Sequence, residues 1–247
     1  MLIKACLNGG TTRQQHPSVP QTPDELAADA VAAVQSGAGA VHLHPRDAAA
    51  AETLDPGAVL AAVAAVRAAA PLTPVGVTTG LWTAGGDRAR RTALVSGWTG
   101  DDRPDFASVN LSEPGAAELA GLLSELGIAV EAGLWSVADA DQLADSDFGG
   151  DVLRILIEPH DATPEVAVAI AAGIEAALNR HGFTTPRLHH GYGAATWPVL
   201  RAAILLGRDI RVGLEDTTIL ADGRLASGNA ELVEAAVSLV ALTSRPS

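Results

Sequence analysis

The sequence predicts an α/β fold, a single (β/α)8 barrel that spans residues 1–247, and three observations support this prediction. Short apolar runs rich in branched residues alternate with longer Ala- and Leu-rich stretches of helical period, and eight such pairs follow one another along the chain. Hydrophobic residues make up 48% of the chain but aromatic residues only 3%, which is typical of helices packed on buried parallel strands. No segment is left over for a second domain, so a closed barrel is favoured over a doubly wound sheet, which would show a similar alternation.

The eight expected strands are short apolar runs, and they cover residues 2–8, 40–45, 75–80, 106–112, 129–135, 153–158, 187–192 and 210–215. The helices between them begin at recognisable caps. Thr22 and Thr163 each precede a proline and an acidic residue, and Asp55 precedes Pro56. Further helix starts are expected at residues 112–114 and 229–231, a surface loop at 97–104 and a loose tail from residue 243.

Composition limits the partners of the chain. The formal net charge of −13 argues against nucleic acid as the main partner, because binding phosphates requires clustered Lys and Arg. No run approaches the ~20 apolar residues of a membrane helix, and the apolar start breaks too early for a signal peptide, so we expect a cytoplasmic protein without a membrane partner. The single cysteine, Cys6, excludes an internal disulfide and a thiolate metal cage, and we expect a small buried residue there.

Two histidines mark the end of the second expected strand. The chain reads His42-Leu43-His44-Pro45-Arg46, and the period of two along a strand sends His42, His44 and Arg46 to one face, which should point into the barrel. The two imidazoles would then lie close enough to bind one ion. Arg46, together with Arg13 and Arg211, falls near the expected mouth and provides positive charge for an anionic substrate.

A carboxylate on the eighth expected strand completes this set. Glu215 shares a strand face with Arg211, and in such barrels alternate strands fill the same interior layer, so strands two and eight bring their side chains together. Two histidines and one glutamate leave coordination positions open for water or substrate. The sequence therefore predicts one divalent ion, zinc or another divalent metal, bound by His42, His44 and Glu215.

These motifs, taken with others in the same order, resemble the beta-keto acid cleavage enzyme family. The resemblance covers nearly the whole chain and is carried by residues 8–9, 16–17, 19–20, 22–26, 42–47, 77–80, 108–110, 211–216, 222–223, 226 and 229–233. It implies a (β/α)8 barrel that binds zinc and a reaction between a β-keto acid and acetyl-CoA as co-substrate. The products would be acetoacetate and a new acyl-CoA.

The resemblance also implies a role for individual residues. His42, His44 and Glu215 would bind the metal, Asp216 would be the general base, and Arg211 would be its partner. The substrate would contact Thr78 on the third expected strand and Ser108 or Asn110 on the fourth. Apart from the resemblance, the charge and position of Arg46 predict that it also contacts the substrate. Independently of the family, breaking a carbon–carbon bond beside a ketone places negative charge on carbonyl oxygens, which a metal with open positions stabilises.

One loop departs from the family pattern. Members that cleave an amino-bearing keto acid are expected to carry an acid after the first strand, but residues 8–12 here contain no carboxylate. Because an unpaired buried cation is costly, we predict a preference for a neutral or polar acyl chain over 3-keto-5-aminohexanoate.

For other residues near strand ends, the sequence allows more than one role. Glu131 and Glu158 either reach the mouth or support other residues there. Of His189 and His190, one must face outward if the seventh strand is regular, and the other is a candidate for contact with substrate or with the pantetheine of CoA.

Two other classes of function are kept as alternatives. One is a metal-dependent hydrolase on a similar barrel, in which the ion activates water; such barrels carry the His-x-His pair on the first strand rather than the second. The other is a barrel without catalytic activity that binds a ligand or serves assembly. The family resemblance further suggests a homotetramer or a larger homo-oligomer.

Overall fold

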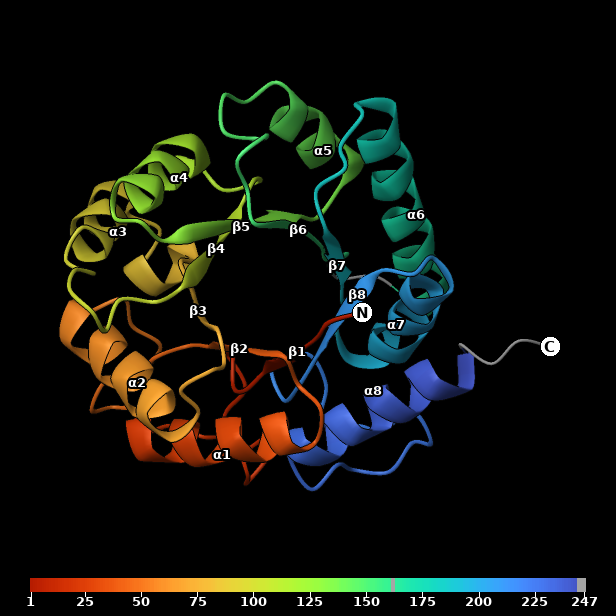
Figure 1. The fold of residues 1–247 in the computed structure, drawn as a ribbon, viewed down its shortest axis with the longest axis horizontal. Helices are drawn as coiled ribbons and strands as arrows, with labels where there is room; N and C mark the ends of the chain where they lie inside the picture. Colours follow the sequence, from red (N-terminus) through yellow and green to blue (C-terminus); the bar gives the residue numbers. More distant parts are fainter. Residues whose placement is uncertain (161–162, 244–247) are drawn as a thin grey trace.

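The computed structural model describes residues 1–160 and 163–243. In these residues eight parallel strands form a closed barrel in which each strand pairs with its neighbours in chain order, and β1 pairs with β8 (Figure 1). The strands are β1 (Ile3–Cys6), β2 (Ala40–Leu43), β3 (Val75–Thr78), β4 (Phe106–Asn110), β5 (Ala129–Leu134), β6 (Arg154–Ile157), β7 (Arg187–His189) and β8 (Asp209–Val212). The predicted (β/α)8 barrel is confirmed.

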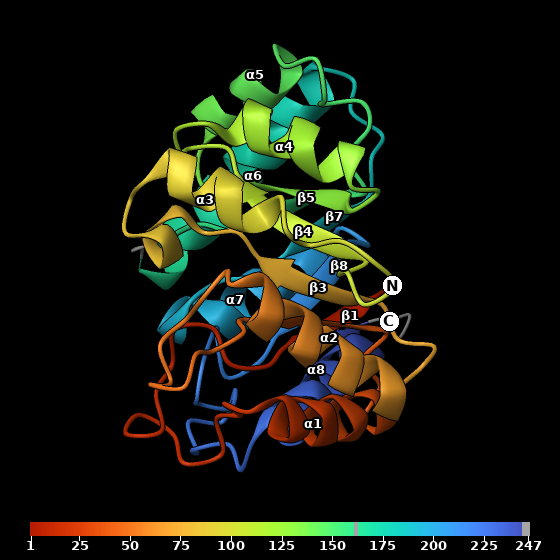
Figure 2. The same cartoon turned by 90° about the vertical axis from the view of Figure 1, so that its left-hand side faces the viewer.

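Within the described ranges, eight α-helices surround the barrel, and Figure 2 shows α1 to α5 along its outside. They are α1 (Pro23–Gln35), α2 (Pro56–Ala69), α3 (Arg88–Val95), α4 (Ala116–Glu125), α5 (Val137–Ala144), α6 (Pro164–Arg180), α7 (Thr196–Leu205) and α8 (Asn229–Thr243). Two short 3-10 helices, Leu81–Ala84 and Gly193–Ala195, lie in the loops after β3 and β7. A loose tail was expected from residue 243, but Thr243 is the last residue of α8. Residues 244–247, the rest of that tail, lie outside the described residues.

Most helix starts follow the expected caps. The Thr22 side chain accepts a hydrogen bond from the Glu25 amide in a capping box, and Asp55 accepts one from the Ala58 amide. The helix start expected at 112–114 is wrong, because α4 begins at Ala116 after Gly115. The polar side chains of that segment are bound elsewhere: Ser112 Oγ donates to Asp139 Oδ1 at 2.6 Å.

The loop before β4 differs from the expectation of a simple surface loop. Trp98 within it is fully buried, and its indole Nε1 donates to the Leu54 carbonyl at 3.1 Å. A buried indole needs such a partner for its N–H group, and here the loop before α2 provides the Leu54 carbonyl. The segment therefore anchors α3 and β4 to the core.

The barrel interior beneath the mouth is filled by charged and aromatic side chains. Lys4 Nζ lies 2.5 Å from Glu131 Oε2, Arg154 lies 3.2 Å from Glu131 Oε1, and both cations lie over the ring of Phe106. Lys4 and Glu131 are completely buried, so each compensates the charge of the other. Glu131 thus supports the barrel floor and does not reach the mouth.

No helix among the described residues combines the length and the apolar character needed to cross a membrane.

Candidate active site

A cavity of about 190 Å³ opens at the carboxyl ends of the strands. Side chains from around the barrel line it: His42, His44, Arg211 and Glu215 on one side, Thr78, Ser108 and Asn110 on β3 and β4, and Trp135, Glu158, His160 and Tyr192 across from them. The carboxyl ends of barrel strands are where enzymes of this fold carry their active sites. The strands are shorter than expected because residues such as Glu215 leave the sheet to form this mouth.

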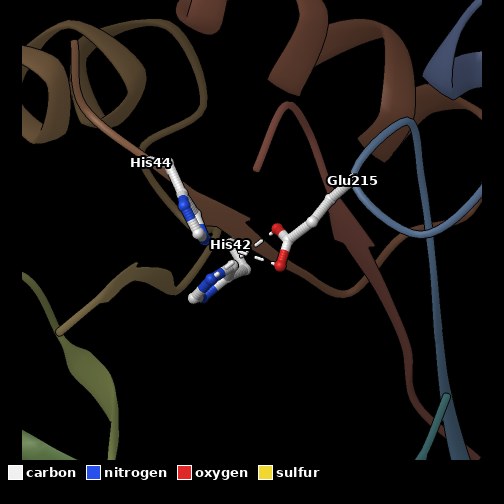
Figure 3. Close-up of side chains that lie close together, drawn as sticks. All are labelled: His42, His44 and Glu215. Carbon is white, nitrogen blue, oxygen red and sulfur yellow. Dashed lines mark ion pairs between the residues drawn. The ribbon is translucent and has the colours of Figure 1, made fainter. Parts of the chain in front are cut away.

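His42, His44 and Glu215, which all line the cavity, lie close together (Figure 3). His42 Nε2 lies 3.8 Å from Glu215 Oε2, His44 Nε2 lies 3.5 Å from Glu215 Oε1, and one ligand atom of each residue lies within 4.8 Å of the others. Tetrahedral zinc with bonds of about 2.1 Å places its ligand atoms about 3.4 Å apart, so this spacing fits an ion with small adjustments.

The environment of these atoms also fits a metal. The side chains of His42 and Glu215 are 1% and 9% exposed, yet His42 Nδ1 and Glu215 Oε2 have no hydrogen-bond partner among the described residues. Buried polar atoms are otherwise nearly always paired, so the unpaired oxygen of Glu215 indicates a missing ligand at this position. Burial holds the pKa of His42 well below its ordinary value, in spite of Glu215, so its imidazole is neutral as ligation requires.

Glu52, which the strand pattern did not indicate, fixes the orientation of His44. Its carboxylate contacts His44 Nδ1 and accepts a hydrogen bond from Trp82 Nε1 at 3.3 Å. With Nδ1 bound in this way, Nε2 of His44 faces Glu215. Burial opposes the charge on His44, but Glu215 and Glu52 together raise its pKa to about 9.

Gly9 leaves space for the side chain of Glu215. Its φ of +49° lies in the left-handed region, and a Cβ there would lie 2.1 Å from Glu215 Cγ. The Asn8-Gly9 motif therefore lets the loop after β1 pass directly over the glutamate.

Arg211 connects Glu215 with Asp216. Its guanidinium contacts Glu215 Oε1 and donates to Asp216 Oδ1 at 2.7 Å and to Asp216 Oδ2 at 3.2 Å. The Cys6 thiol lies 2.8 Å from Asp216 Oδ2 as a further donor. Burial raises the pKa of Asp216, but Arg211 and then His190 outweigh it and hold the pKa below its ordinary value. Cys6 is buried as expected and also contacts a predicted catalytic residue.

The three candidate substrate contacts on β3 and β4 all line the cavity. Thr78 Oγ1 accepts a hydrogen bond from the Gly80 amide at 3.1 Å, and Asn110 Nδ2 donates to Glu113 Oε1 at 2.9 Å. Both side chains are thereby held in place with part of their hydrogen-bonding capacity still available.

Arg46 departs from the expectation of a side chain that faces the cavity with the histidines. The strand β2 ends at Leu43, so the period of two no longer applies three residues later. The Arg46 guanidinium donates to the carbonyls of Gly9, Thr11 and Ala50, and Arg46 does not line the cavity. Arg13, also expected near the mouth, pairs at the surface with Glu25.

The cavity wall opposite the metal group is built around Glu158. Trp135 Nε1 donates to Glu158 Oε1 at 3.0 Å, and His190 Nε2 lies 2.9 Å from Glu158 Oε2. Burial raises the pKa of Glu158, but His190 outweighs it and lowers the pKa below its ordinary value. Burial and Arg211 lower the pKa of His190, but Asp216 and Glu158 raise it above its ordinary value.

The adjacent histidines at the end of β7, His189 within the strand and His190 just after it, face opposite sides, as the period of two requires. His189 points outward to Glu175 on α6, with Nε2 2.9 Å from Glu175 Oε1. His190 points inward but is fully buried beneath the cavity wall, whereas Tyr192 lines the cavity.

The whole chain matches one family of known proteins. The model of the family described as "beta-keto acid cleavage enzyme" matches residues 1–150 and 151–247. The chain is 25% identical to a 3-keto-5-aminohexanoate cleavage enzyme of Fusobacterium nucleatum, covering 97% of this chain and 90% of that protein. It is 24% identical to the enzyme of the same name from Acetoanaerobium sticklandii, covering 100% and 93%.

Solved structures show the same fold. ObcA, solved as a binary complex with oxaloacetate and as a ternary complex with a C4-CoA adduct and oxalate, superposes with a TM-score of 0.74 at 18% identity. The match covers 90% of this chain, which spans 63% of the length of the ObcA chain. Because the family model matches both segments that make up the chain, the protein belongs to the beta-keto acid cleavage enzyme family.

Proposed function

We propose that this protein exchanges the acyl group of a β-keto acid with acetyl-CoA in a metal-dependent reaction that yields acetoacetate and a new acyl-CoA. The observation that carries the proposal is the convergence of His42, His44 and Glu215 at the cavity, beside Arg211, in a chain of this family. The names of the relatives and the oxaloacetate and CoA adduct bound to ObcA support a keto acid and a CoA thioester as the substrates.

The stoichiometry determines which bonds change. C2 of the keto acid loses a proton, and the electron pair of that C–H bond attacks the carbonyl carbon of acetyl-CoA, which releases the CoA thiolate. The thiolate then adds to the original keto carbon, and the C2–C3 bond breaks with its electron pair on C2. A proton returns to C2 and completes acetoacetate, so the reaction consumes no net proton.

A divalent ion, zinc or another metal with similar ligand preferences, would be held by His42, His44 and Glu215 and would act as a Lewis acid for carbonyl oxygens. The chain's own residues bind and orient the substrates. We propose that Arg211 keeps Asp216 ionised as the general base for C2, supported by their two hydrogen bonds. Thr78, Ser108 and Asn110 would donate to the keto acid from the part of the cavity formed by β3 and β4.

Arg46, which was predicted as a substrate contact, would act on substrate binding by holding the loop after β1 in place, because its guanidinium binds two carbonyls of that loop. In this loop Gly10, which carries no charge, lines the cavity. We therefore propose a neutral or polar acyl chain. A higher kcat/KM for 3-keto-5-aminohexanoate than for every uncharged analogue would contradict this preference.

The test is an assay of purified, zinc-loaded protein with a panel of β-keto acids, with and without acetyl-CoA. We expect acetoacetate to form only when acetyl-CoA is present, in amounts equal to the new acyl-CoA. A metal-dependent hydrolase would consume its substrate without the thioester, and a ligand-binding protein would form no product. Light scattering in the same buffer tests the predicted homotetramer or larger homo-oligomer.

A further inference from the structure

The active-site cavity is too small for the whole of acetyl-CoA. Its volume is about 190 Å³, whereas sites for drug-sized ligands usually enclose about 300–1,000 Å³. A small keto acid and an acetyl thioester fit into such a space, but CoA also carries a pantetheine arm and a phosphorylated nucleotide. The nucleotide end must therefore bind outside the cavity, on the surface around the mouth.

Three surface grooves lie next to loops that follow barrel strands, and they differ in charge. The groove beside α1 contains Arg13, but its guanidinium pairs with Glu25 in the same groove. The groove over α5 and α6 contains the exposed carboxylate of Glu165, and no cation is among the described residues that line it. The third groove, between α7 and the loop after β8, has a volume of about 700 Å³ and contains Arg201. We call it the α7 groove.

Arg201 is available to bind an anion. Its side chain is exposed, and it has no hydrogen bond or ion pair with another described residue. The nearby carboxylate of Asp222 does not compensate it, because Asp222 binds Arg224 at 2.8 Å. The hydroxyl group of Thr218 lines the same groove and likewise donates to no described residue. In a chain with a formal net charge of −13, the α7 groove thus combines a free cation with a free donor.

The walls of the α7 groove suit the rest of a nucleotide. Trp197 on α7 and the half-exposed Ile219 on the loop after β8 give it apolar sides. The Trp197 indole Nε1 donates to the Ile219 carbonyl at 2.8 Å, so the two sides are fixed relative to each other. A flat base can pack against such walls while its phosphates bind the guanidinium of Arg201, which is well suited to phosphate oxygens.

The α7 groove begins where the wall of the cavity ends. Tyr192 lines the cavity, and the next residue, Gly193, lines the groove. The Gly193 amide donates to the Asp216 carbonyl at 2.7 Å, so the loops after β7 and β8 meet at this point. These two loops are also where barrels of this fold frequently bind phosphate groups.

We propose that the α7 groove binds the nucleotide end of CoA, with its phosphates at Arg201 and Thr218 and its base between the apolar walls. The pantetheine arm crosses the loop at Gly193 and carries the thioester into the cavity. This inference rests on the proposed function, because it names the place where acetyl-CoA binds. It leaves the roles of the metal group and of Asp216 unchanged.

The test compares Arg201→Gln with Arg180→Gln in the zinc-loaded protein. Arg180 on α6 is a matched control, because it is also exposed and without a described partner but lines none of the three grooves. We expect R201Q to raise the KM for acetyl-CoA about threefold to tenfold, since a charged hydrogen bond on open surface is weaker than a buried one. The KM for the keto acid and kcat should stay unchanged, and R180Q should match the wild type.

A truncated thioester separates nucleotide binding from a general structural effect. S-acetylpantetheine lacks the nucleotide, so R201Q and wild-type protein should use it with equal kcat/KM. Ala221, which is exposed and lines the α7 groove, allows the charge to be varied in both directions. Ala221→Lys should lower the KM for acetyl-CoA and Ala221→Glu should raise it, and high salt should reduce both differences.

The inference is overturned if R201Q raises the KM for acetyl-CoA less than threefold, or if it impairs the use of S-acetylpantetheine equally. It is also overturned if A221E dissociates an oligomer in light scattering without changing this KM, because the groove would then be covered by a second copy of the chain. Calorimetric titration with CoA distinguishes this failure from that of the proposed function. Wild-type protein that binds CoA more tightly than R201Q but forms no acetoacetate would refute the proposed function and support the groove.

Discussion

The carboxylate of Glu52 should determine how tightly the metal binds, although it is not itself a predicted ligand. It contacts His44 Nδ1 and so leaves Nε2 to face Glu215. Glu52→Gln keeps the shape of the side chain and an oxygen for Trp82, but it replaces a charged acceptor by a neutral one, and charge-assisted hydrogen bonds are about twice as strong.

We expect E52Q to bind zinc about 10–100-fold more weakly, the usual effect of removing such a partner, which corresponds to about 1.4–2.7 kcal/mol. The assay is competition for zinc with a chromophoric chelator at fixed pH. Glu118→Gln is the control, because it also removes one carboxylate but from an exposed pair with Arg88. Equal affinity of E52Q and wild-type protein, or an equal loss in E118Q, would refute this explanation of His44 orientation.

Three further predictions concern stability and backbone space. Burial raises the pKa of Asp29 from 3.8 to about 6, so the stability that comes from its protonated form is fully present below about pH 4 and is lost as the pH rises through 6. Asp29→Asn should therefore raise the free energy of unfolding by about 1–2 kcal/mol at pH 7.5 and leave it unchanged at pH 3.5. Denaturant unfolding at the two pH values measures this difference. Gly9→Ala should displace Glu215 and reduce bound zinc below half an equivalent by metal analysis, and full occupancy would contradict the predicted clash. Gly133→Ala should displace Asn110, a proposed substrate contact whose Oδ1 lies 2.9 Å from the added Cβ, and lower kcat/KM for the keto acid while the metal content stays at the wild-type level; an unchanged kcat/KM would show that the space at Gly133 is not needed.

The strands and the metal group were predictable because both depend on local periodicity. Buried parallel strands are continuous apolar runs, and the alternation of such runs with helical stretches placed β1 to β8 within a few residues of their observed bounds. The period of two placed His42 and His44 on one face, and the closure of the barrel brought Glu215 beside them. Each of these steps needs only the strand geometry.

Residues in the loops were not predictable in the same way. Arg46 lies only two positions after His44, but the chain leaves the strand at Leu43 and turns the guanidinium toward backbone carbonyls. Glu52 reaches His44 because the same loop folds back on itself through a bridge between Arg46 and Glu52. No sequence period describes such a turn, since it depends on contacts with the neighbouring loop.

The position of Glu158 depends on a missing side chain elsewhere. Its reach into the cavity requires the empty space at Gly133 on the adjacent strand, and its partner His190 comes from the strand beyond. From the sequence alone, Glu158 could either line the mouth or support other residues there. Its position depends on packing across three strands, which the neighbouring residues in the chain do not determine.

The claim on which the account depends is that His42, His44 and Glu215 bind one divalent ion. The most direct measurement is a crystal structure of the zinc-loaded protein with anomalous data collected on both sides of the zinc edge. We predict one anomalous peak per chain, with bonds of about 2.0–2.2 Å to all three side chains. A map without a peak between these residues, in protein that still forms acetoacetate, would contradict the account.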